Sequence, residues 1–145
     1  SLAEMLDTIE ALYDRICARA GLARSDIAAI GVGVPGFVDS EAGMVEWSST
    51  LTERRVPLAA AARARLALPV CIDNDANLVA LAELWFGAGR RLSDFAVVTI
   101  EHGVGMGLVL NHRIYRGARG LGLELGHTKV QLDGALCRCG QRGCL

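Results

Sequence analysis

Residues 70–77 join a short apolar segment to a cluster of acidic and amide side chains, reading Val70-Cys71-Ile72-Asp73-Asn74-Asp75-Ala76-Asn77. The apolar start is rich in β-branched side chains and is typical of a short buried strand over 70–72. Residues 76–86 are largely apolar and predict a helix directly after the polar cluster. The stretch therefore predicts a strand that passes straight into a helix, with polar side chains at the carboxyl end of the strand.

The sequence before this stretch also alternates between helix and strand patterns. Residues 2–17 carry apolar side chains at the three-four spacing of an amphipathic helix, which Gly21 ends. Residues 27–34 form an apolar run that predicts a buried strand, and Pro57 opens an alanine-rich helix to about residue 68. Residues 37–55 predict loop or irregular strand. This order indicates an α/β fold with at least part of its sheet parallel.

The second half of the chain predicts an antiparallel meander. Strands are expected over 95–100, 108–110 and 113–115, with a glycine-rich turn at 103–107 and a tight turn at 111–112 between them. The Gly-Ala-Gly-Arg-Arg run at 87–91 marks the change of pattern and is a candidate hinge between two lobes.

The composition excludes several classes of protein. The 145 residues are 52% hydrophobic and 21% charged, which excludes an intrinsically disordered chain. The net charge of −1 does not favour nucleic-acid binding by this segment itself. Acidic residues near the start speak against a signal peptide, and no apolar run approaches the roughly 18 residues of a membrane span. We therefore expect a soluble, cytoplasmic protein.

The run at residues 31–36 matches the GxGxxG pattern of dinucleotide-binding proteins. That interpretation requires a helix to begin inside the motif. Here Pro35 occupies the fifth position and residues 37–40 continue as loop, so the pattern favours a strand that ends in a tight turn. The glycines then allow a close approach to the backbone, for which a ligand is one candidate.

The polar cluster at 73–77 has two interpretations. Asp or Asn side chains cap the first turn of a helix, and that explains one of them. A carboxylate at the carboxyl end of a strand also lies where open α/β sheets bind ligands, where it can accept a proton from a substrate hydroxyl. The glycine run at 103–107 is likewise either a phosphate cradle or a hairpin turn. Glu101 and His102 precede it, and a carboxylate there favours the turn.

The cysteines fall into two groups. Cys17 and Cys71 lie in apolar segments and are expected to be buried hydrophobic side chains. His127, Cys137, Cys139 and Cys144 have the spacing H-x9-C-x-C-x4-C, which supplies the tetrahedral shell of a structural zinc site. A redox cysteine pair or three unrelated thiols are the alternatives. A zinc ion at His127 would also fix the position of the nearby Glu124.

Taken together, these segments resemble the ROK family, which groups sugar-responsive repressors with sugar kinases. The resemblance covers nearly the whole chain, and the matching runs are 31–38, 74–77, 103–107, 115–117, 124–127 and 137–145. It implies a partial actin-like or ribonuclease-H-like fold with two lobes and a zinc-binding loop. Residues 1–88 are then the rest of the N-terminal lobe, and residues 89–145 are the start of the C-terminal lobe, with the zinc loop at 127–144.

The resemblance also implies roles for individual residues. In the kinases of the family, the residue that matches Asp75 is the general base that deprotonates the sugar hydroxyl. Residues that match Asn74, Glu124 and His127 bind the sugar, and His127 is also a zinc ligand. The implied site is completed by a loop that lines the sugar cleft, with Gly33 and Gly36, and by a turn near the nucleotide phosphates, with Gly103, Gly105 and Gly107.

Departures from the kinase pattern favour the regulator branch. Glu101-His102-Gly103 stands where the kinases typically carry Gly-Thr-Gly, and Thr50 stands where the family usually has a sugar-contacting Asn. The first phosphate loop of the fold, Asp-x-Gly-Gly-Thr, is absent from the sequence. A carboxylate that faces ATP is unfavourable.

The sequence therefore predicts a non-catalytic effector domain of a ROK-type transcriptional regulator, as a fragment. Its expected ligands are a sugar or amino sugar and a structural Zn²⁺ ion. We expect DNA contacts from a winged helix upstream of Ser1, and a homodimer. The alternative is a fragment of an ATP-dependent sugar kinase, of the glucokinase or N-acyl-hexosamine kinase type, with Asp75 as base and ATP and Mg²⁺ as cofactors. A third interpretation is an assembly domain that keeps the zinc and binds no sugar.

Overall fold

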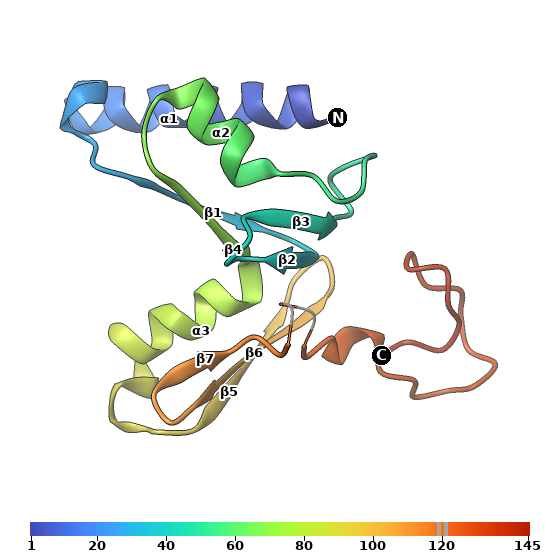
Figure 1. Cartoon of the computed structure of the whole chain (residues 1–145). Helices are drawn as coiled ribbons and strands as arrows, with labels where there is room; N and C mark the ends of the chain where they lie inside the picture. The colour runs from blue at the N-terminus through green and yellow to red at the C-terminus, as the bar shows by residue number, and fades with distance from the viewer. Residues whose placement is uncertain (119, 121) are drawn as a thin grey trace. The chain divides into compact units, whose positions relative to one another are not determined.

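The structure is a computed structural model that describes residues 1–118, 120 and 122–145 (Figure 1). The chain consists of two compact units, Ser1–Asp75 and Ala76–Leu145, which are described separately below. The assignment of residues 1–88 and 89–145 to two family lobes stays a prediction. Within the described residues, no helix is both long enough and apolar enough to cross a membrane.

The first unit begins with the predicted amphipathic helix, α1 (Leu2–Ala20). The Ser1 hydroxyl accepts a hydrogen bond from the Glu4 amide, and the Glu4 side chain bonds back to the Ser1 backbone, which caps the first turn. Gly21 ends the helix in the left-handed conformation, as predicted. The apolar stripe buries Tyr13 and Cys17, so the expectation that Cys17 is buried is confirmed.

A parallel pair of strands forms the centre of this unit. Strand β1 (Ile30–Val34) pairs with β4 (Val70–Asn74) in the register Ile30↔Val70 to Val34↔Asn74, which confirms the expected parallel pairing. β1 begins later than the sequence predicts, because η1 (Arg24–Asp26) forms a turn of 3-10 helix that ends at Ile27. β4 runs two residues farther than predicted, through Asp73 and Asn74.

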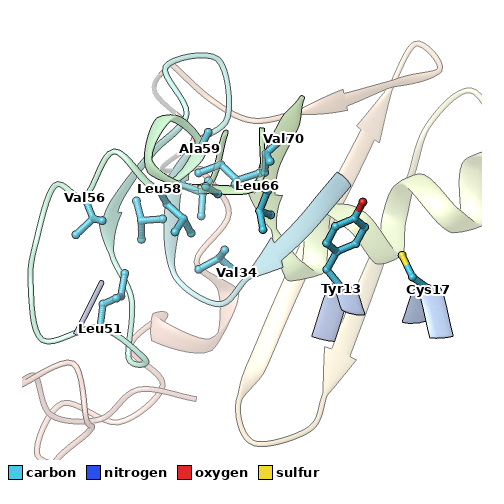
Figure 2. Close-up of a cluster of buried hydrophobic side chains, with 13 residues drawn as sticks. Tyr13, Cys17, Val34, Leu51, Val56, Leu58, Ala59, Leu66 and Val70 are labelled. Carbon is cyan, nitrogen blue, oxygen red and sulfur yellow. The ribbon is translucent and has the colours of Figure 1, made fainter. Parts of the chain in front are cut away.

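The core of the first unit lies between these strands and its helices. Helix α2 (Leu58–Leu66) packs on β4, and α1 packs on α2 (Figure 1). Leu58 is fully buried among Val34, Leu66 and Val70 (Figure 2). The prediction that Cys71 is buried is wrong. Side chains alternate along β4, so Val70 and Ile72 face the core while Cys71 points to the opposite, exposed face.

A short antiparallel hairpin follows the glycine-rich turn at the end of β1. It consists of β2 (Phe37–Asp39) and β3 (Met44–Trp47), with a register shift between Phe37 and Val38. A strand and not a helix therefore follows the GxGxxG run, which confirms that the run is not a dinucleotide-binding motif. The region expected to be loop or irregular strand contains both of these strands.

The second unit contains helix α3, which spans Asp75–Trp85 and so begins at the last residue of the first unit, and the expected meander. After η2 (Ala88–Arg91), strands β5 (Phe95–Ile100), β6 (Val104–Leu110) and β7 (Arg113–Tyr115) pair antiparallel in the order β5-β6-β7. The tight turn at Asn111 and His112 is confirmed, and both residues have positive φ.

The predicted glycine turn at 103–107 is wrong in extent. Only Gly103 lies in the turn, whereas Gly105 and Gly107 belong to β6. A Cβ atom on Gly107 would lie 2.6 Å from the Ala76 carbonyl oxygen and 2.6 Å from the Ala80 Cβ atom. The close packing of β6 on α3 therefore explains why glycine occupies positions 105 and 107. A role of this run near a phosphate stays a prediction.

This packing predicts that two glycine substitutions in one run differ in their effect on the free energy of unfolding. Gly107→Ala forces backbone and side-chain atoms of α3 apart and is expected to lower the free energy of unfolding by about 1–3 kcal/mol. Gly103→Ala meets open space, since no heavy atom lies within 4 Å of its added Cβ. We expect it to change stability by less than about 0.5 kcal/mol. Urea denaturation of both variants measures the difference, and equal destabilisation would contradict the assignment of Gly107 to packing.

Candidate metal centre and ligand site

The four residues of the predicted zinc site come together in the second unit. One ligand atom each from His127, Cys137, Cys139 and Cys144 lies within 4.8 Å of all the others. The Cys139 and Cys144 Sγ atoms are 3.8 Å apart, and Cys137 Sγ is 3.6 Å from His127 Nδ1. Tetrahedral zinc with bonds of about 2.3 Å to sulfur and about 2.0 Å to nitrogen places sulfurs about 3.8 Å apart and sulfur and nitrogen about 3.5 Å apart. These two separations match such an ion, and the other pairs lie within 4.8 Å.

All five cysteines are free thiols in this structure, and a disulfide bond would be about 2.05 Å long. The redox pair therefore stays an alternative in its reduced form. The backbone of the loop is held independently of these contacts. The Cys137 amide donates to the Gln141 carbonyl at 2.7 Å, and the Gly140 amide donates to the Cys137 carbonyl at 2.9 Å. This tight turn carries both Cys137 and Cys139.

A lysine that the sequence analysis did not single out faces this cluster. Lys129 Nζ donates a hydrogen bond to Cys144 Sγ at 3.0 Å. The Lys129 ammonium, followed by His127, lowers the pKa of the Cys144 thiol to about 6. Because metals bind thiolate and not thiol, this environment favours the ligating form of Cys144 at neutral pH. A lone lysine two residues after His127 gives no sequence signal for this contact, which depends on how the loop folds back.

The turn that carries His127 is anchored on the meander. Helix η3 (Leu125–His127) is one turn of 3-10 helix, in which the His127 amide donates to the Glu124 carbonyl at 3.0 Å. Gly126 is buried against β6, where a Cβ atom would lie 2.2 Å from the Val104 carbonyl oxygen. This close contact fixes Glu124 and the predicted metal ligand His127 at the ends of one short turn beside the β5–β6 hairpin.

The tip of that hairpin is the turn at residues 101–103. Glu101 and His102 are exposed there, and the Glu101 amide donates to the Gly103 carbonyl at 3.0 Å. Val104, the next residue, is the one that η3 contacts through Gly126. The hairpin tip and the turn with Glu124 therefore belong to one packed region of the second unit.

The other predicted ligand residues lie in the first unit, at the carboxyl ends of the parallel strands. The register pairs Gly33 with Asp73 and Val34 with Asn74. The Asn74 side-chain amide donates to the Gly36 carbonyl at 2.9 Å, which ties the end of β4 to the turn after β1. Asp73 is buried, and its carboxylate accepts a hydrogen bond from the Asn74 amide at 2.8 Å. Asp75 follows as the first residue of α3.

The structure thus assembles two halves of the predicted site. Gly33, Gly36, Asn74 and Asp75 gather at one edge of the first unit, and Glu124 and His127 share one turn of the second. A joint sugar site built from both halves stays a prediction.

Comparison with curated proteins relates the chain to both repressors and kinases. It is 40% identical over 119 residues to a xylose repressor of Caldicellulosiruptor bescii, a match that spans 82% of this chain and 30% of that protein. It is also 40% identical over 123 residues to a glucokinase of Halalkalibacterium halodurans, across 84% of this chain and 37% of that enzyme. The chain therefore spans only about a third of the length of these relatives.

Solved structures give the same pair of similarities. A ROK family transcriptional regulator, described as a homologue of the E. coli MLC protein, matches 99% of this chain with a TM-score of 0.79 and 34% identity. The match covers 35% of that regulator. A ROK family glucokinase from Streptomyces griseus, in complex with glucose and AMPPNP, matches 93% of this chain with a TM-score of 0.79 and 37% identity. It covers 44% of the enzyme.

These neighbours support the expected actin-like α/β fold of sugar kinases and related regulators. The family model described as ROK matches residues 1–145, the whole of the chain. The chain belongs to the ROK family.

Proposed function

We propose that this chain is the sugar-sensing part of a ROK-family transcriptional regulator and does not itself transfer phosphate. The observation that carries the proposal is the hairpin tip at residues 101–103. An exposed carboxylate at Glu101 and an imidazole at His102 stand where the family's kinases place small residues near the nucleotide phosphates. A carboxylate within about 4 Å of a phosphate oxygen costs about 1 kcal/mol even in water, and more in a cleft.

In this proposal the sugar or amino sugar binds through both halves of the site. Asn74 and Asp75 supply an amide and a carboxylate at the carboxyl end of β4, and Glu124 and His127 supply a second carboxylate and an imidazole. Because His127 Nδ1 faces the thiol of Cys137, its Nε2 atom is the ring nitrogen that addresses a sugar hydroxyl. The loop with Gly33 and Gly36 lines the sugar cleft in the family's kinases, and we propose the same role for it here.

The proposed zinc site is structural. Four protein ligands at His127, Cys137, Cys139 and Cys144 leave no position for a reactive water, so the ion holds His127 and its loop in place. Zinc is a better match than calcium or magnesium, since thiolates and imidazole are not the ligands of those hard cations.

The wider role of the protein follows from the regulator assignment. DNA binding belongs to a winged helix upstream of Ser1, in keeping with the net charge of −1 of this segment. The regulator acts in the cytoplasm as a homodimer. Sugar binding changes operator affinity by favouring one of two conformations, which requires that the sugar bind the two with different affinity.

A sugar kinase is the second candidate, and the position of Asp75 favours it. Asp75 begins α3 directly after β4, where the family's kinases carry the general base, and the glucokinase relative is as similar as the repressor. In that case ATP with Mg²⁺ supplies the phosphoryl group, and Gly103, Gly105 and Gly107 form the segment nearest the phosphates. The packing of Gly107 against α3 leaves Gly103 as the residue of the three that lies in the turn.

Metal analysis tests the zinc site. We expect about one zinc ion per chain in the purified protein, and far less in Cys139→Ser, because three ligands bind zinc more weakly than four. Cys71→Ser is the matched control, an exposed cysteine of the first unit that keeps all four ligands. A chelator is expected to lower the Tm of the wild type and of Cys71→Ser only. Full zinc content in Cys139→Ser would contradict the assignment.

Calorimetry with a panel of pentoses, hexoses and amino sugars tests the effector site. Asn74→Ala removes both a proposed sugar contact and the hydrogen bond to Gly36, so we expect a loss of affinity of about tenfold or more. Thr8→Ala, on the exposed side of α1, should bind like the wild type. A wild type that binds no sugar of the panel would overturn the effector proposal in favour of an assembly domain.

Nucleotide binding tests the choice between regulator and kinase. The wild type should show no phosphoryl transfer from ATP to any sugar above background. The double variant Glu101→Gly with His102→Thr removes the carboxylate from the hairpin tip and should bind ATP with Mg²⁺ about fivefold more tightly. Glu41→Gln removes an exposed carboxylate in the first unit and should leave the affinity for ATP with Mg²⁺ unchanged. Sugar phosphorylation by the wild type would establish the kinase alternative.

A further inference from the structure

Lys129 is the only lysine of the chain, and it lies against the proposed metal centre without being one of the four ligands. Its ammonium group donates a hydrogen bond to Cys144 Sγ across 3.0 Å. The side chain is otherwise exposed to solvent. The position of this single ammonium group is therefore tied to one thiol of the cluster.

The backbone holds the two residues opposite each other. Lys129 and Cys144 are partners in an isolated antiparallel bridge between the segment after η3 and the end of the zinc loop. The Leu145 amide donates to the Thr128 carbonyl at 3.1 Å, and this bond lies beside the pair. Residues directly opposite in an antiparallel pair have neighbouring side chains on one face. The contact between Nζ and Sγ is thus set by the fold of the loop as well as by a flexible side chain.

The net charge of the metal-loaded cluster explains how this contact would stabilise it. Three thiolates and a neutral imidazole around a divalent cation carry a net charge of −1. An ammonium group that bonds to one of the sulfurs offsets this charge, and hydrogen bonds to charged groups are stronger than neutral ones. Groups that bond to the ligands of a metal tune both its affinity and the reactivity of those ligands.

We propose that Lys129 is a positioning residue of the metal centre, which stabilises the zinc-bound Cys144 thiolate through a charge-assisted hydrogen bond and protects its sulfur from electrophiles. The proposal rests on the zinc site proposed above. It assigns to the ammonium group a role in metal retention that an ordinary surface lysine does not have.

The test compares zinc affinity among variants of the full chain, in competition with a chromogenic chelator at fixed pH and ionic strength. Lys129→Met keeps the length of the side chain and removes its charge and donors, and it should bind zinc about tenfold more weakly. Lys129→Arg restores a cationic donor and should recover most of the affinity. Arg138→Met is the matched control, since it removes an exposed charge between Cys137 and Cys139 without touching the Nζ–Sγ contact.

A second measurement separates a specific contact from a general loss of structure. In the cobalt-substituted protein, the loss of a hydrogen bond to a thiolate raises the energy of the sulfur lone pairs. The thiolate-to-cobalt charge-transfer band of Lys129→Met should therefore shift to longer wavelength, whereas that of Arg138→Met should not. Alkylation of the zinc-loaded protein should also be faster in Lys129→Met, with Cys144 as the site identified by mass spectrometry.

The outcomes distinguish this proposal from the zinc site itself. If the wild type retains zinc and Lys129→Met equals Arg138→Met in affinity and spectrum, the role of Lys129 is wrong and the zinc site stands. If Lys129→Arg binds zinc as weakly as Lys129→Met, a cationic hydrogen-bond donor does not restore the affinity, and the proposed role of the ammonium group is wrong. If the wild type binds no zinc, both proposals fall together.

Discussion

The second unit depends on the close contact of strand β6 with the segments packed against it. On one side Gly107 brings β6 against α3, where a side chain would collide with Ala76 and Ala80. At the start of the same strand, the carbonyl of Val104 meets Gly126 of η3. Neither contact tolerates an added side chain without a shift of backbone atoms. Within the second unit, β6 thereby fixes helix α3 and the turn that carries Glu124 and His127.

The fold could largely be predicted because its elements carry strong local signals. The helix spacing before Gly21, the apolar runs of β1 and β5, and the turn at Asn111 indicate their elements from the local sequence alone. The incorrect predictions concern positions at which tertiary packing determines the structure. Cys71 lies in an apolar run, but the alternation of β4 exposes it, and the glycines of β6 resemble a turn because their role is to approach α3.

In the candidate site, too, features with a local sequence pattern could be predicted and contacts that depend on the folded chain could not. The spacing of His127, Cys137, Cys139 and Cys144 was sufficient to predict that these four side chains lie together, in an arrangement that suits a tetrahedral metal ion. The hydrogen bond from Asn74 to Gly36 and the contact from Lys129 to Cys144 could not be predicted. Both join residues brought together by strand pairing, and a shift of register by one residue would move either side chain to the opposite face.

In the second unit, η3 and Val104 connect the proposed metal centre, Glu124 and the hairpin tip. Zinc at His127 would rigidify the turn that presents Glu124, and that turn rests on Val104, directly after Glu101 and His102. In a kinase, this contact would connect the sugar to the phosphate-binding turn. With a carboxylate at the tip, the same contact is compatible with the proposed regulator, which would bind a sugar without phosphorylating it. A ligand that orders this region then changes the population of one conformation, and the free energy available for this is limited to its difference in affinity for the two states.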